Sequence, residues 1–126
     1  MLAVAEHLEI HSDLIPRIAT GFCSGIARTG GMCGAVSGGI MAIGLSLGRN
    51  EPSDDIDPCY QAVQAFMEKF SAQYNALSCL DLTCVDLSTP DGQVAFRMKG
   101  QIHLCTEYVE NATRYVMEIL SNSAST

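Results

Sequence analysis

The sequence predicts an all-α protein, a compact single-domain bundle of about four to six helices around a small-residue central helix, over residues 1–126. Apolar residues recur at three- and four-residue spacing in the segments 57–74 and 101–121, which is the period of an amphipathic helix. A glycine- and alanine-rich apolar segment, 34–47, precedes them. No two segments alternate as paired strands would. Since 48% of the residues are hydrophobic, one core can form without disulfides.

The start of the chain predicts two short helices followed by a loop. Residues 2–9 form the first helix. Ser12 caps the second, and Pro16 lies in its first turn, where a missing N–H costs little. Four glycines within residues 20–32 predict positive φ angles and close approach of the backbone. This segment is therefore expected to be irregular.

The segment 34–47 is the predicted central helix, and Gly48 ends it. A glycine inside a helix costs about 1 kcal/mol relative to alanine. Small residues nevertheless recur along this segment at Ala35, Gly38, Gly39, Ala42 and Ser46. We therefore expect this helix to pack closely against another backbone.

The second half of the chain predicts two long amphipathic helices with short elements between them. Asp57 and Pro58 are typical of a helix start. The apolar stripe of that helix contains Cys59, Val63, Phe66, Met67, Phe70 and Tyr74. The elements that follow are a helical turn at 78–84, a short helix from the Thr89–Gly92 turn to Met98, a helix over about 101–121, and a frayed tail from Ser121 to Thr126.

Charge and hydropathy exclude several classes of partner. Fourteen acidic and seven basic residues give a net charge of −7, which repels phosphate backbones and anionic lipid. We therefore expect no nucleic-acid binding and no membrane insertion. The longest apolar stretch, residues 33–47, is shorter than the roughly 20 residues of a membrane-spanning helix. Residues 1–7 lack the basic region of a signal peptide, so a cytoplasmic location is expected.

Six cysteines carry the most specific chemistry of the sequence. Cys33 lies at the predicted start of the central helix, where unpaired N–H groups and the helix dipole favour a thiolate. For a single cysteine taken alone, a small buried side chain at the crowded start of the helix is the more common explanation. Cys105 lies with Ile102 and Val109 on the apolar stripe of the last helix and points inward. If Cys33, Cys79 and Cys105 converge, three thiols line one buried pocket.

The remaining candidates are less specific. Cys79 and Cys84 are separated by four residues, which matches a zinc knuckle only loosely, and no second pair accompanies them. Cys59, at the start of an amphipathic helix, is interpreted as a packing residue. Arg28 in the glycine-rich segment could pair with a nearby thiolate or bind an anion. We expect it instead to be a surface arginine.

Residues 20–48 contain the motif Cys33-Gly34-Ala35-Val36-Ser37-Gly38. This segment resembles the C_GCAxxG_C_C family of small bacterial and archaeal redox-active proteins. The resemblance extends over about residues 9–120, and it implies that Cys79 and Cys105 are the downstream family cysteines. Members of the family typically carry another cysteine on an N-terminal helix. Residues 1–20 contain none, and Cys23 or Cys84 are the candidates to replace it.

The resemblance and the thiols together predict a redox-active cysteine protein. The candidate redox thiols and metal ligands are Cys33, Cys79 and Cys105, and the further cofactor-binding candidates are Cys23, Gly34 and Cys84. These residues either exchange disulfides or hold an iron–sulfur cluster or another thiophilic metal. An electron-transfer or thiol partner protein and a homodimer are consistent with either reading. The alternative is a non-catalytic helical scaffold or oligomerisation protein whose cysteines only pack.

Overall fold

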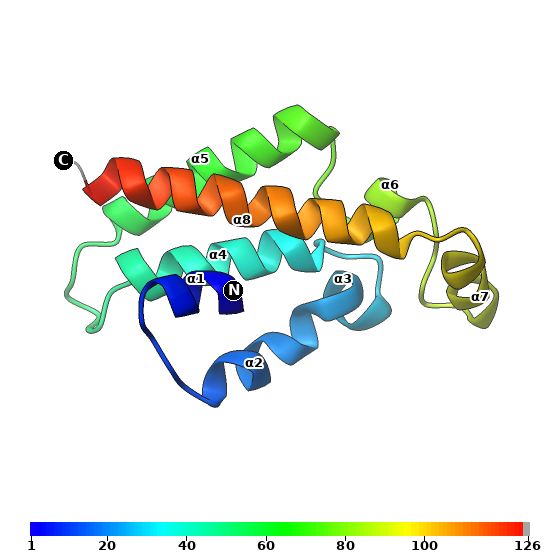
Figure 1. Cartoon of the computed structure of the whole chain (residues 1–126), viewed down its shortest axis with the longest axis horizontal. Coiled ribbons are helices and arrows are strands. Elements are labelled where there is room, and N and C mark those ends of the chain that lie inside the picture. Colours follow the sequence, from blue (N-terminus) through cyan, green and yellow to red (C-terminus); the bar gives the residue numbers. More distant parts are fainter. Residues whose placement is uncertain (125–126) are drawn as a thin grey trace.

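Three long helices form the centre of the molecule: α4 (Gly34–Leu47), α5 (Asp57–Tyr74) and α8 (Ile102–Ala124) (Figure 1). Each of them packs against the other two. The computed structural model describes the backbone of residues 1–124 and the side chains through Asn122. Within that range the regular secondary structure is helical, so the predicted all-α class is confirmed.

Six shorter elements surround the three long helices. In chain order they are α1 (Leu2–His7), α2 (Leu14–Ala19), a 3-10 turn η1 (Thr20–Phe22), α3 (Cys23–Arg28), α6 (Cys79–Thr83) and α7 (Pro90–Met98). The helices α1, α2 and α3 lie on one side of α4 and α8 (Figure 1). The helices α6 and α7 lie at the end of the bundle where α8 begins. The described chain thus contains more helices than the four to six predicted.

Close packing of α4 occurs where the small residues predict it, but the partner is an aromatic ring. A Cβ added to Gly39 would lie 2.4 Å from Cζ of Phe66, whose side chain is fully buried. No alanine fits there without moving that ring. The expected close contact is therefore confirmed at Gly39. Its partner, however, is a side chain of α5 and not a backbone.

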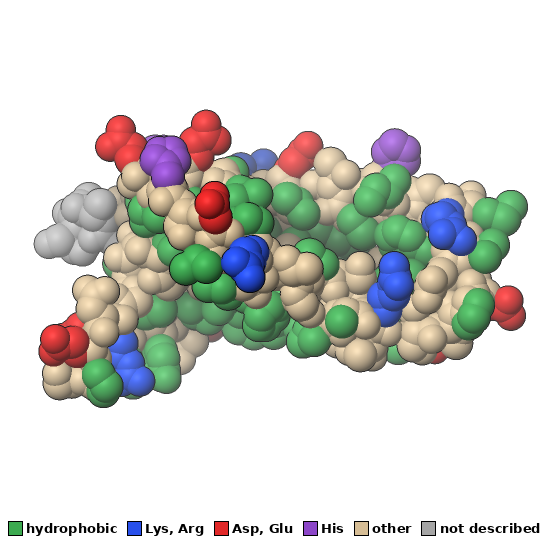
Figure 2. Space-filling view, turned by 90° about the horizontal axis from the view of Figure 1, so that it is seen from below, with side chains coloured by type: hydrophobic (Ala, Val, Ile, Leu, Met, Phe, Trp, Pro, Cys, Tyr) green, Lys and Arg blue, Asp and Glu red, His purple; other side chains and the backbone are tan. Residues whose placement is uncertain are grey.

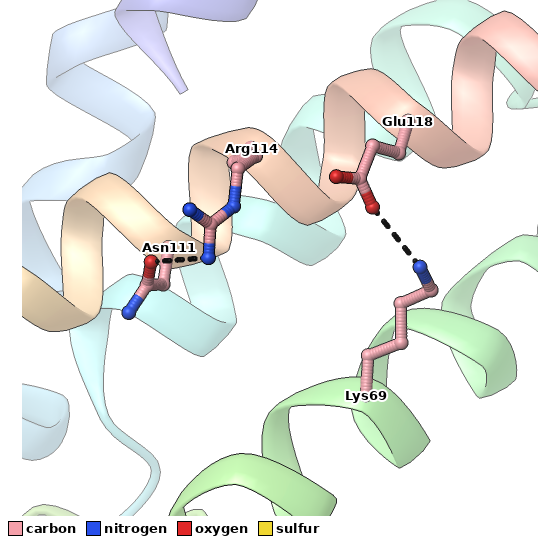
Figure 3. Close-up of polar contacts among 4 residues, drawn as sticks. All are labelled: Lys69, Asn111, Arg114 and Glu118. Atoms are coloured by element: carbon pink, nitrogen blue, oxygen red, sulfur yellow. Dashed lines mark hydrogen bonds and ion pairs between the residues drawn. The ribbon is translucent and has the colours of Figure 1, made fainter.

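Polar contacts join α5 to α8 at the surface of the bundle (Figure 3). The Lys69 ammonium lies 3.0 Å from a carboxylate oxygen of Glu118, and 5.8 Å above the centre of the Tyr115 ring. On α8 itself, Arg114 donates a hydrogen bond of 2.7 Å to the side-chain oxygen of Asn111. Both groups in the Lys69–Glu118 pair are about half exposed, so we expect this ion pair to add little stability.

The segment predicted to be an irregular loop contains a left-handed turn. Residues Ser24 to Ala27 have φ between 52° and 64°, and Arg28 has φ of 68°. Only glycine adopts this conformation without strain, and each L-residue pays about 1–2 kcal/mol for it. The glycine content correctly indicates positive φ, but it does not indicate that four non-glycine residues share it.

The other end of the chain also differs from prediction. The helix α8 continues to Ala124, so fraying from Ser121 is wrong for residues 121–124. Residues 125–126 of the predicted tail lie outside the described residues.

Figure 2 shows apolar side chains among scattered charges on the face below the view of Figure 1. In the part of the chain that the structure describes, no helix combines the length and apolarity needed to cross a bilayer.

Candidate functional site

Two segments far apart in the sequence meet as a short antiparallel pair next to the start of α4. The Cys33 amide donates to the Leu77 carbonyl at 2.8 Å, and the Cys79 amide donates to the Gly31 carbonyl at 2.7 Å. Met32 and Ser78 form the bridge between them. Cys33 and Cys79 therefore occupy diagonal positions on the same face of the pair. The Cα atoms of such diagonal neighbours typically lie about 7–8 Å apart.

This face opens into a pocket of about 480 Å³ that four cysteines line: Cys23, Cys33, Cys79 and Cys105. They come from four elements, at or near the starts of α3, α4, α6 and α8. Apolar side chains form much of the remaining wall, among them Leu87, Phe96, Ile102 and Val109. The sequence places Ile102 and Val109 on the buried stripe of α8, but they are 60% and 53% exposed because they border this pocket.

A helix cap and one close packing contact fix the position of Cys79. Ser78 caps α6 by accepting a hydrogen bond of 3.1 Å from the Asp81 amide, which fixes where the helix begins. A Cβ added to Gly25 would lie 2.3 Å from the Cβ of Cys79. The left-handed turn of α3 therefore packs directly against the cysteine, and Cys79 is only 8% exposed.

Burial raises the pKa of three of the pocket thiols, those of Cys33, Cys79 and Cys105. It raises the pKa of Cys33 above its ordinary value, and the amides of Ala35 and Val36 at the start of α4 lower it by less. Burial also raises the pKa of Cys79, with a further increase from the Cys33 charge and an opposing effect of the Thr83 hydroxyl. The expectation that the helix start makes Cys33 easier to ionise is therefore wrong, because desolvation raises the pKa of Cys33 by more than the two amides lower it.

Cys105 and Tyr108 complete the cluster from α8. Burial, followed by the charges of Cys33 and Cys79, raises the pKa of Cys105. Burial also raises the pKa of Tyr108, and the charges of Cys105 and Cys33 add to it. The Tyr108 hydroxyl donates to the Leu82 carbonyl at 3.1 Å. Tyr108 was not predicted from the sequence, although its position three residues after Cys105 places both on one helix face.

The family can be assigned once this arrangement is known. The chain matches the model of the family described as "Putative redox-active protein (C_GCAxxG_C_C)" over residues 1–119. The chain belongs to this family. Comparison with curated proteins and with solved structures gave no match.

The three cysteines that we expected from the resemblance to be the family cysteines, Cys33, Cys79 and Cys105, all line the pocket. Gly34 and Cys23 line it as well. Cys23 is exposed, and its sulfur lies 3.9 Å from the Ala19 carbonyl oxygen.

The other two cysteines of the chain lie elsewhere. Cys84 is exposed at the left-handed end of α6, where its sulfur contacts the Asp81 carbonyl at 3.8 Å. Of the two candidate replacements for the family's N-terminal cysteine, the structure therefore brings Cys23 to the pocket and not Cys84. Cys59 packs against the main hydrophobic core, as its position on the stripe of α5 predicts.

The sulfur atoms do not form a ready coordination set. Among the residues that the structure describes, no group of three or more His, Cys, Asp or Glu side chains is placed to hold a metal ion. All six cysteines are free thiols. The donor chemistry suits a thiophilic metal, but the arrangement of these side chains does not fit one as it stands.

Proposed function

We propose that this protein is a redox-active dithiol protein in which Cys33 and Cys79 undergo thiol–disulfide exchange. The observation that carries the proposal is that both residues face one pocket from two segments whose backbones are hydrogen-bonded to each other. A disulfide spans Cα atoms about 4.4–6.8 Å apart. The diagonal spacing of about 7–8 Å is close to this range, so a small backbone movement suffices to close the bond.

Cys33 is the attacking thiol in this proposal, and Cys79 resolves the mixed disulfide. Cys33 is half-buried and faces the two amides that favour its thiolate, whereas Cys79 is buried. The half-buried sulfur is the one that a substrate reaches first. Since the thiolate is the nucleophile, exchange accelerates as pH rises toward the raised pKa of Cys33.

The reaction balances with a disulfide as the oxidant. The Cys33 thiolate attacks one substrate sulfur, so a bond to Cys33 forms, the substrate S–S bond breaks and the first thiolate leaves with the proton that Cys33 lost. Cys79 then attacks the Cys33 sulfur and releases the second thiol. Two electrons pass from the protein dithiol to the substrate disulfide, which becomes two thiols.

The proposal is tested by mapping disulfides after mild oxidation. Purified reduced protein is treated with diamide, a neutral azo oxidant that takes up two electrons and two protons, and its free thiols are counted. We expect the wild type to lose two thiols and to yield a peptide pair linking Cys33 and Cys79. Cys33→Ser and Cys79→Ser should each abolish this pair, whereas the control Cys84→Ser should retain it. An unchanged thiol count in the wild type would exclude the proposal.

Binding of an iron–sulfur cluster or another thiophilic metal is the second candidate, favoured by the four thiols around one pocket. Cys23, Cys33, Cys79 and Cys105 would supply the ligands, and the bound group would supply one-electron redox chemistry. It requires these side chains to move closer together than they stand. Anaerobic purification with iron and sulfide analysis tests it, because a colourless, metal-free protein contradicts it.

A helical scaffold with structural cysteines remains the competing class. It predicts that alanine at Cys33, Cys79 and Cys105 changes only the free energy of unfolding, with no loss of a specific disulfide. The diamide experiment separates the two classes directly. A thiol or electron-transfer partner protein, a homodimer and a cytoplasmic location are further parts of the proposal.

A further inference from the structure

Two arginines line the same pocket as the four cysteines. Arg28 extends from the left-handed turn of α3, and Arg97 from the last turn of α7. They are two of only seven basic residues in a chain of net charge −7. No aspartate or glutamate is among the described residues that line this pocket. The pocket is therefore locally cationic on an acidic protein.

Neither arginine is neutralised by the protein. Within the described part of the chain, neither Arg28 nor Arg97 forms an ion pair with a carboxylate. Other surface hollows have the opposite character, since one is lined by Asp55 and Asp57 with Lys69, and another by Glu6 and Asp13. An anion approaching the molecule is therefore attracted to the cysteine pocket and repelled by those hollows.

The size of the pocket selects the kind of ligand. Its volume of about 480 Å³ is many times the share of one water molecule, about 30 Å³, and it falls in the usual range for small-molecule sites, about 300–1,000 Å³. Leu87, Phe96 and Ile102 add apolar surface to the pocket that the arginines and the thiols line. This combination suits a small organic molecule with a short apolar stem and an anionic end.

We propose that the substrates of this site are small anionic disulfides, namely disulfides of thiols that carry carboxylates. This proposal rests on the proposed function, because it names the oxidant that the Cys33 and Cys79 dithiol reduces. The guanidinium groups of Arg28 and Arg97 pair with the substrate carboxylates, since a planar guanidinium matches a carboxylate in charge and shape. The substrate S–S bond is reduced to two carboxylate-bearing thiols, and the protein gains one disulfide.

Three small symmetric disulfides that differ in charge test the proposal. They are dithiodipropionate, which is anionic, hydroxyethyl disulfide, which is neutral, and cystamine, which is cationic. The rate of protein thiol loss is measured with each at low ionic strength. We expect the anionic disulfide to react fastest and the cationic one slowest. Raising the salt concentration should narrow the differences, because exposed charges are screened.

Substitution of the arginines assigns the preference to this pocket. Arg28→Gln with Arg97→Gln should slow the reaction of the anionic disulfide about fivefold to tenfold relative to the reaction of the neutral disulfide. The matched control, Arg17→Gln with Arg49→Gln, removes the same charge from exposed positions that do not line the pocket, and should behave as wild type. Unfolding curves verify that both variants fold, and Arg97→Gln alone replaces the double variant if it does not.

The outcomes separate this proposal from the proposed function. Equal rates for the three disulfides in the wild type, or a preference that the control pair removes as fully as the pocket pair, would overturn the anionic substrate class. Such a result leaves the exchange function intact if diamide still links Cys33 to Cys79. Failure of diamide to form that bond overturns both, because the dithiol is then not redox-active.

Discussion

The three-helix centre and the cysteine-bearing end of the molecule are built differently. In the centre, large apolar side chains are fully buried: Val4, Val36, Ile43, Phe66, Phe70 and Val116. At the other end, the buried cluster contains only Cys79, Val85 and Leu87, with Ala95 and Phe96 packed against it. No residue of α7 is buried. The backbone pairing of residues 31–33 with 77–79 ties this end to the centre.

Most of the buried apolar surface thus lies in the three-helix centre, whereas the thiols of the pocket lie at the other end. Apolar burial of the core side chains holds α4, α5 and α8 together. The pocket lies where α4 and α8 begin, so Cys33 and Cys105 lie on closely packed elements. Cys79 and Arg97 stand on elements with little buried surface. Elements of low local stability are the ones that open first, so the pocket can change shape while the core stays folded.

The largest expected effect comes from emptying the core. Phe66→Ala removes a fully buried ring and should lower the free energy of unfolding by about 3–5 kcal/mol. Phe96→Ala, at a half-buried position beside the small cluster, should cost about 1–2 kcal/mol. Urea denaturation of both variants measures the difference. Equal losses would mean that the two ends contribute equally to stability.

A second comparison addresses the packing of the pocket. Gly25→Ala places a Cβ at positive φ against Cys79 and should cost about 2–4 kcal/mol. Gly30→Ala also has positive φ, but its Cβ would meet Leu80 at 3.5 Å, an ordinary contact, so about 1 kcal/mol is expected. We further expect Gly25→Ala to speed alkylation of Cys79. A Gly25→Ala protein with unchanged stability and labelling would contradict the close contact between α3 and α6.

Alkaline pH should weaken the protein through the pocket thiols, by less than either substitution. Burial raises the pKa of Cys33, Cys79 and Cys105, so the unfolded chain loses these protons first, near the ordinary thiol pKa of about 8.5. Their contribution to the free energy of unfolding is constant below that pH and falls as pH rises above it.

The measurement for this prediction is denaturation at several pH values on either side of the ordinary thiol pKa. Cys33→Ala with Cys79→Ala should show a shallower alkaline loss than the wild type. Tyr108 acts in the same direction at higher pH, because burial also raises its pKa, and it is retained in both proteins. An equal slope in the two proteins would show that the thiols are not desolvated.

The smallest effect is expected at the surface of the core. Lys69→Met removes the ion pair with Glu118 and should cost about 0.2–1 kcal/mol, because both groups are about half exposed. Glu118→Gln should have a similar effect, and added salt should reduce it. Unfolding at low and high salt measures this. A loss of more than about 2 kcal/mol in the free energy of unfolding would show that this surface ion pair stabilises the core far more than expected.

The fold was predictable wherever a local pattern repeats over several turns. The stripe of α5 with Phe66 and Phe70, and the small residues of α4, correctly indicate which faces are buried. The left-handed turn was not predictable in full, because Ile26 and Ala27 have no local preference for positive φ. The exposure of Val109 was missed because a periodic stripe does not show where a neighbouring element ends.

By itself, the sequence determined the all-α class, the family and Cys33 as the first thiol to consider. These depend on local periodicity and on a contiguous motif. Only the tertiary structure decided that Cys23 and not Cys84 joins the pocket, that Arg28 and Arg97 flank it, and that the pKa of Cys33 is raised and not lowered. The physical reason is that burial and proximity arise from elements far apart in the chain, whose separation no local pattern records.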